Sequence, residues 1–61
     1  MTPAELQAAL MAAFALAPKP LDASAVMDIA RQVCASDIAS LNGFAAWFDR
    51  HGDYLLTRVN A

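Results

Sequence analysis

The sequence has little of what small proteins use to cross-link themselves or to build a chemical site. It contains one cysteine, Cys34, and one histidine, His51, so it cannot form an intrachain disulfide or supply the usual set of zinc ligands. Its two glycines, Gly43 and Gly52, are far apart, which excludes a glycine-rich phosphate loop. We therefore interpret Cys34 as a small buried hydrophobe rather than as a reactive thiol.

The surroundings of His51 do not indicate a metal or catalytic site. His51 stands between Asp49 and Asp53, but a calcium loop needs more oxygen ligands in a longer loop. A cationic histidine instead suits the end of a helix, where Gly52 can stop the last turn. A nucleophile would have to be a cysteine or a serine paired with this histidine, and the serines fall near expected helix starts. We expect no catalytic residue, no cofactor, no metal and no small-molecule substrate.

Positive charge is also scarce. Four Lys and Arg residues stand against six Asp and Glu residues, for a formal net charge of −2. The basic residues occur singly along the chain, at Lys19, Arg31, Arg50 and Arg58. Binding to nucleic acid or to an anionic membrane surface draws on clustered positive charge. We therefore expect neither nucleic acid nor membrane as a partner.

The longest apolar stretch, residues 6–17, is apolar apart from Gln7 and is too short to cross a bilayer, which takes about 20 residues. Its end resembles a secretory cleavage site, but no basic residue precedes it and Glu5 stands where positive charge belongs. Pro18 directly after the site also disfavours cleavage. We therefore expect a cytoplasmic protein.

What the chain has in excess is apolar residues. They make up 59% of the sequence, and charged residues 16%, against about 45–50% and about 25% in ordinary domains. The chain has 61 residues, so we expect a single domain over residues 1–61. A domain this small buries only about 60% of the surface that its unfolded chain exposes. The surplus predicts burial against a second chain, and we expect a homodimer or a protein partner.

Local signals predict a first helix over residues 3–17. Thr2 and Glu5 have the spacing of a capping box, and Met1 and Leu6 have that of a hydrophobic staple across it. Two prolines then end the helix.

A second helix is expected over residues 22–35, with Asp22 as its cap. Extending its apolar stripe would bury Asp37, so we place a break near residues 35–36. A third helix, residues 37–51, would start at Asp37 or Ser36.

The third helix has two uncertain points. A turn at Asn42–Gly43 is an open alternative. We expect the helix to end at His51–Gly52, followed by a short element over residues 53–59 that reads as a helical turn or a strand. The predicted fold is thus all-α: a small, dimeric three-helix bundle with a short fourth helical turn at the C-terminus.

The first helix suggests where a partner binds. One stripe of larger residues, including Leu10 and Phe14, is expected to face the core. Most other positions are apolar too, and a helix that is apolar all round is normally buried on every side. Met11 and Leu16 lie off the stripe, so we predict that they contact another chain.

The aromatic residues add a second candidate surface. Trp47 and Phe48 are adjacent, so they cannot both face one core, and one of them should lie near the surface. A tryptophan with an arginine nearby, here Arg50, is typical of interaction hot spots. The expected protein-binding residues are therefore Met11, Leu16, Trp47 and Arg50.

One segment gives a competing interpretation. Residues 29–36 resemble the first helix and turn of a helix-turn-helix, although Cys34 stands at the position of the turn glycine. The segment that would be the recognition helix, Asp37 to Phe48, carries no Lys, Arg or Gln to contact bases or phosphates.

The sequence therefore favours a small non-enzymatic protein-binding module. It would act as a regulator, an inhibitor or an assembly factor by occupying the surface of a partner protein. Short alanine-rich chains of this kind are often encoded by phages or mobile elements. The alternatives are a minimal helix-turn-helix DNA-binding protein and a docking domain of a larger assembly protein.

Overall fold

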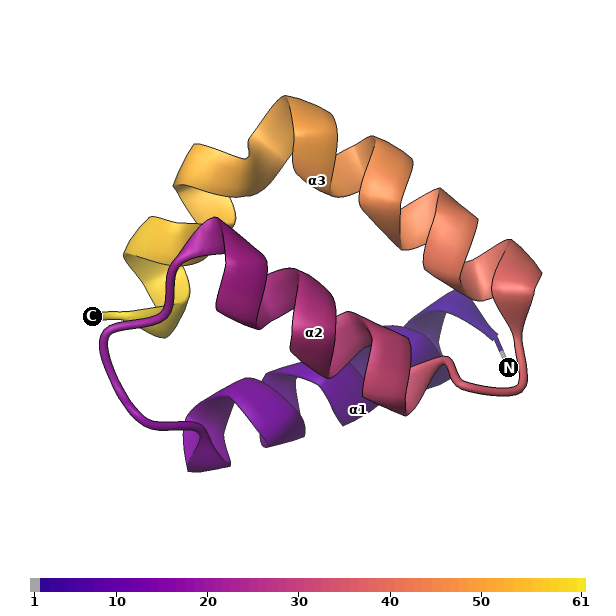
Figure 1. Cartoon of the computed structure of the whole chain (residues 1–61), viewed down its shortest axis with the longest axis horizontal. Coiled ribbons are helices and arrows are strands. Elements are labelled where there is room, and N and C mark those ends of the chain that lie inside the picture. Colours follow the sequence, from indigo (N-terminus) through magenta and orange to yellow (C-terminus); the bar gives the residue numbers. More distant parts are fainter. Residues whose placement is uncertain (1) are drawn as a thin grey trace.

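The computed structural model describes residues 2–61, and these fold into three helices without a strand. The helices are α1 (Pro3–Leu16), α2 (Ala23–Val33) and α3 (Ile38–Val59). In Figure 1, α1 and α3 both run from right to left and α2 returns between them. Each helix contacts the other two. The predicted all-α bundle of three helices is confirmed.

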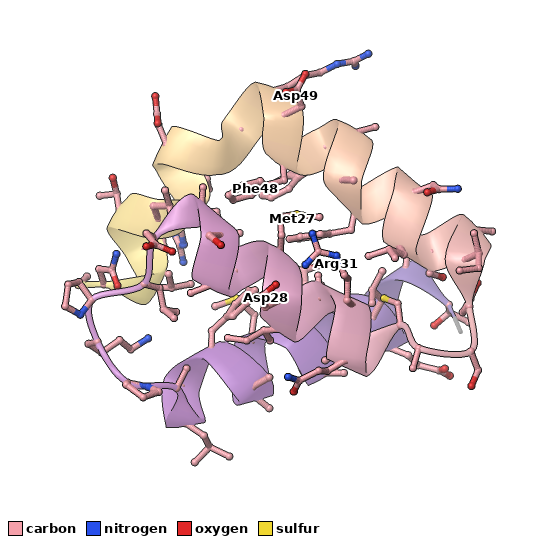
Figure 2. All side chains as sticks on the ribbon, in the orientation of Figure 1. Met27, Asp28, Arg31, Phe48 and Asp49 are labelled. Atoms are coloured by element: carbon pink, nitrogen blue, oxygen red, sulfur yellow. The ribbon has the colours of Figure 1, made fainter. Side chains whose placement is uncertain are left out.

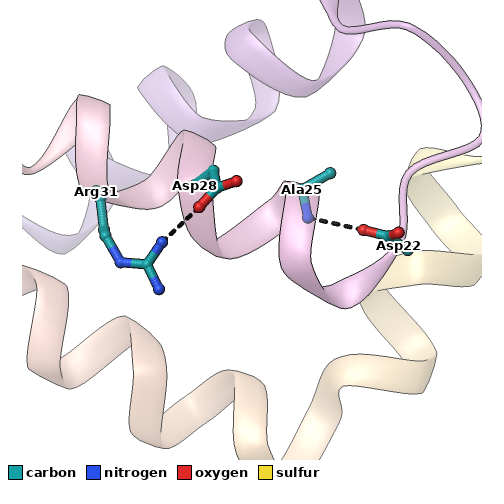
Figure 3. Close-up of polar contacts among 4 residues, drawn as sticks. All are labelled: Asp22, Ala25, Asp28 and Arg31. Atoms are coloured by element: carbon teal, nitrogen blue, oxygen red, sulfur yellow. Dashed lines mark hydrogen bonds and ion pairs between the residues drawn. The ribbon is translucent and has the colours of Figure 1, made fainter.

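The first two helices begin at the predicted caps. The Thr2 hydroxyl accepts a hydrogen bond from the Glu5 N–H at 3.2 Å, and the Glu5 carboxylate accepts one from the Thr2 N–H at 3.5 Å. The Asp22 carboxylate accepts from the Ala25 N–H at 2.7 Å (Figure 3). These bonds satisfy N–H groups that have no partner inside a helix. The predicted staple involves Met1, which lies outside the described residues.

Asp37 caps α3 through two hydrogen bonds from one residue. The Ser40 hydroxyl donates to the Asp37 carboxylate at 2.7 Å, and the Ser40 N–H donates to it at 3.1 Å. Both bonds favour the ionised form, so they hold the pKa of Asp37 below its usual value of 3.8. α2 ends at Val33, two residues before the expected end at 35, and the buried Cys34 follows as its C-cap.

The core contains Leu10 and Phe14, as the periodicity of the first helix predicts. Leu10 and Phe14 of α1 are 4% and 1% exposed, and Val26 and Ala30 of α2 are fully buried. α3 and the first connection complete the cluster with Leu21, Phe44, Leu55 and Val59. Burying a side chain of this size contributes about 1.5–3 kcal/mol.

α3 is kinked at His51, which has the non-helical angles φ −124° and ψ 17°. Two helical parts meet there, so the helix end predicted at His51–Gly52 corresponds to a break in the helix. The second part follows directly, and α3 runs on through residues 53–59 without a loop between the parts. Gly52 does not take the left-handed conformation that would have ended the helix. The physical reason is burial, because Leu55 and Val59 join the core only if the helix continues. The helix also passes through Asn42–Gly43 without a turn.

A polar clamp joins the connection between α1 and α2 to the end of α3. The Lys19 ammonium donates to the carbonyl of Phe14, at 2.7 Å, and to that of Val59, at 2.5 Å. Beside it, the Asn60 side chain forms two hydrogen bonds with the Leu21 backbone, donating to its carbonyl at 2.8 Å and accepting from its N–H at 2.6 Å. The C-terminal ends of α1 and α3 are therefore held together.

We predict that Lys19→Met lowers the free energy of unfolding by about 1–3 kcal/mol, because two helix-end carbonyls lose a charged donor. Urea denaturation followed by circular dichroism measures this change. Arg50→Met removes another exposed cation and serves as the control, with an expected change below about 0.5 kcal/mol. Equal effects of the two substitutions would show that the clamp contributes nothing specific.

Asp37 should make stability depend on pH in acid. Because its pKa is lower in the folded protein, its contribution is complete above the unfolded value and is lost as pH falls through the folded one. The stability difference between the parent and Asp37→Asn should therefore be largest near neutral pH and shrink below pH 3.8. Denaturation at a series of pH values tests this, and a difference that stays constant with pH would contradict it.

Candidate functional site

An apolar groove runs between α1 and α3 and encloses about 470 Å³. Buried core side chains from both helices form its floor: Leu10, Phe14, Phe44 and Leu55. Exposed or half-buried residues form the rest of its lining: Leu6, Gln7 and Met11 on α1, and Gly43, Trp47, Tyr54 and Arg58 on α3. We call this feature the α1–α3 groove.

Three large side chains on the rim of the groove remain partly outside the core. Met11 is 40% exposed, Trp47 41% and Tyr54 59%. The Trp47 ring is tilted against the rings of Phe44 and His51, with centroids 6.0 Å and 5.3 Å away. These contacts hold the indole at the groove and leave part of it accessible.

One charged residue lines the groove, and it lies near the end of α3. The Arg58 guanidinium donates a hydrogen bond to the Tyr54 hydroxyl at 3.0 Å and lies 5.4 Å from the centre of the Tyr54 ring. The other lining residues are uncharged. The groove is thus apolar along its length and positive at one end.

Phe48 packs against the core, whereas the adjacent Trp47 is partly exposed. Phe48 points towards α2 and lies near Met27, whereas its neighbour Asp49 points away from the bundle (Figure 2). Phe48 and Met27 are both half-buried and pack against the core. Trp47 is therefore the aromatic residue of this pair that is available to a partner.

Gly43 leaves part of the groove open. A Cβ atom at this position would meet no atom within 4 Å beyond the helix's own backbone and chain neighbours. No side chain therefore fills the groove next to Phe44 and Trp47, and another molecule could approach the α3 backbone closely there.

The structure brings together two of the four predicted binding residues. Met11 on α1 and Trp47 on α3 both line the α1–α3 groove. Leu16 is 89% exposed at the end of α1 and does not line the groove. Arg50 lines a second, smaller hollow instead. Trp47 and Arg50, which the sequence grouped as one candidate surface, therefore line different hollows.

Tyr54 and Arg58 line the groove but were not predicted as site residues. They lie four residues apart in the part of α3 beyond His51, so they share one face of that part, and this spacing was the available signal. Their position relative to Trp47 depends on the kink at His51, which the sequence pattern does not give.

Three of the four basic residues have partners within the protein. Lys19 binds the carbonyls at the helix ends, Arg31 pairs with Asp28 at 2.5 Å (Figure 3), and Arg58 contacts Tyr54. Lys19 and Arg58 lie near the same end of the bundle, where both are engaged in contacts within the protein, and Arg31 lies on α2.

The side chains and helices of residues 2–61 bear on a metal site and on a membrane span. No group of three His, Cys, Asp or Glu side chains within this range could hold a metal ion. No helix in this range has the length and hydropathy needed to cross a membrane.

In comparisons with known proteins, no family model, no curated protein and no solved structure matches this chain.

We predict no binding to duplex DNA at physiological salt, because the basic side chains are dispersed and three of them are engaged internally. Fluorescence anisotropy with a labelled duplex measures this directly. A salt-sensitive signal at submicromolar protein would contradict the prediction and favour the helix-turn-helix interpretation.

Proposed function

We propose that this protein is a non-enzymatic protein-binding module and that the α1–α3 groove is its binding surface. An apolar segment of a partner protein would occupy the groove and cover its rim. The protein would act as a small regulator, inhibitor or assembly factor by occupying its partner in this way. We also propose that the chain forms a homodimer.

The observation that carries this proposal is the grouping of Met11, Trp47 and Tyr54 around one hollow. Large apolar side chains that stay partly exposed at one place mark interaction surfaces. Aromatic residues and methionine are enriched at such surfaces, and tryptophan and tyrosine dominate their binding energy. The α1–α3 groove offers all three residue types over a rigid core.

The polar groups of the groove also suit recognition rather than chemistry. They are the Gln7 amide, the Trp47 indole N–H, the Tyr54 hydroxyl and the Arg58 guanidinium. Such groups orient a ligand through hydrogen bonds, and the guanidinium can pair with a carboxylate. The set includes no pairing of a nucleophile with a general base, which supports a binding role over catalysis.

A single charge placed in the groove should abolish partner binding. Met11→Glu puts a carboxylate on the apolar rim, and we expect it to weaken binding by at least about tenfold, because that charge would be desolvated. The measurement is affinity purification from the native host with quantitative mass spectrometry, comparing parent and variant baits. Glutamate is a good helix former, so α1 should survive the change.

Leu16→Glu is the matched control, because it introduces the same residue into the same helix outside the groove. It should retain the parent's set of captured proteins. Trp47→Ala gives an independent check from α3 and should lose the same proteins as Met11→Glu. If both groove variants keep every protein that the parent captures, the α1–α3 groove is not the binding surface.

A further inference from the structure

The lining of the α1–α3 groove favours an occupant that satisfies its own backbone hydrogen bonds. Within residues 2–61 the polar side chains of this lining are few: Gln7, Trp47, Tyr54 and Arg58. An extended segment laid along the groove would turn backbone N–H and C=O groups towards apolar side chains and leave many of them without partners. An α-helix pairs these groups internally, so only its side chains would need to match the groove.

The positive charge of the groove is confined to one end. Among the described lining residues Arg58 alone is charged, so no carboxylate from this part of the chain competes for it in the groove. Its hydrogen bond to the Tyr54 hydroxyl uses one N–H of the guanidinium and holds the group beside the Tyr54 ring. The guanidinium has further N–H groups that can donate to a carboxylate. A complementary helix therefore carries an acidic residue at this end and an apolar face along the rest of the groove.

The position of Arg58 also determines the direction of that helix. Lys19 binds carbonyls at the C-terminal ends of α1 and α3, so both helices finish at the Arg58 end of the groove. A partner helix that begins there runs antiparallel to both, and its positive N-terminal end lies beside their negative C-terminal ends. The dipole of the partner helix itself favours acidic residues in its first turn. One carboxylate would thus stabilise the partner helix and pair with Arg58.

Gly43 determines what the other end of the groove can accept. Because open space lies where its side chain would be, a large apolar side chain of the partner fits there, next to Phe44 and Trp47. Gly43 and Arg58 are fifteen residues apart on α3, which is at most about 22 Å along a helix. A partner helix of about four turns spans this distance.

We infer that the segment bound in the α1–α3 groove is an amphipathic α-helix of another protein, packed antiparallel to α1 and α3. An acidic residue in its first turn pairs with Arg58. Its apolar face covers Met11, Trp47 and Tyr54. A large side chain near its C-terminal end fills the space at Gly43. The inference rests on the proposed function, because it states which kind of segment occupies the same groove.

Selection from a displayed peptide library tests this inference before the natural partner is identified. The probes are helical peptides of about four turns with a fixed stripe of leucines and randomised residues in the first and last turns. The target is the full chain. Peptides retained by the parent should be at least about tenfold richer in acidic residues in the first turn than in the last, because only that end meets Arg58.

Two variants with the same change of net charge separate Arg58 from the general charge of the protein. Arg58→Glu should reverse the preference, so that Lys and Arg are enriched in the first turn of the selected peptides. Retention of these basic peptides also shows that the variant is folded. Arg50→Glu is the matched control, because it makes the same substitution on the same helix in the second hollow, and it should keep the acidic preference.

The fluorescence of Trp47 measures the affinity of a selected acidic peptide. Trp47 is the only tryptophan in the sequence, so a change in emission on titration reports occupancy of the groove. Arg58→Glu and Met11→Glu should each bind this peptide at least about tenfold more weakly than the parent. Leu16→Glu lies outside the groove and should bind it as the parent does.

Three outcomes would overturn the inference: no enriched peptide, an acidic preference that is absent from the first turn or survives Arg58→Glu, or a parent dimer that Met11→Glu dissociates in sedimentation equilibrium. The last would make a second copy the occupant.

The proposed function fails separately from this inference. If both Met11→Glu and Trp47→Ala still capture every host protein that the parent captures, the proposed function is wrong, even where the library shows the acidic preference. If both variants lose these proteins but the selected peptides show no acidic preference, the proposed function stands and only the helix with an acidic first turn is removed.

Discussion

The structure depends on one ammonium group placed where two helices end. α1 and α3 run in the same direction, so the partial negative charges of their C-terminal ends lie side by side. Lys19 binds a carbonyl from each and offsets both charges with a single cation. Because the two carbonyls belong to Phe14 and Val59, whose side chains are in the core, this polar contact and the apolar packing hold each other in place.

The groove is a consequence of this arrangement. α1 and α3 are fixed to each other at one end, and the buried residues between them form the floor of the groove. Both parts of α3, before and after the kink at His51, border this groove. α2 covers the core from another side through Val26 and Ala30. The hollow between α1 and α3 is thus the part of the bundle that no third helix covers.

The chain has more large apolar side chains than a bundle of this size can enclose, and the fold gathers much of the surplus in one place. Met11, Trp47 and Tyr54 border the groove, while Leu16 and Ile38 are exposed elsewhere. The basic residues are also distributed unevenly between the interior contacts and the groove. Most of the basic residues serve contacts within the protein, and the one that reaches the groove, Arg58, gives it a polarity that an apolar surface alone would lack.

Local chemistry in the sequence was enough to determine the three helix starts and the core. Thr2, Asp22 and Asp37 cap their helices because each lies three residues before the N–H that it accepts from, and Leu10 and Phe14 are buried because helical spacing puts them on one face. The exposure of Met11 followed from the same periodicity. These properties depend on residues a few positions apart, so they can be read without knowledge of the fold.

Tertiary packing decided the rest. Gly52 and His51 have the local character of a helix end, and α3 is kinked at His51, but the helix continues to Val59 and buries Leu55 and Val59 in the core. That continuation brings Tyr54 and Arg58 to the groove that Trp47 also lines. The sequence also could not predict that Lys19 links the ends of α1 and α3. Its second acceptor, the carbonyl of Val59, comes close to Lys19 only when α3 packs against α1.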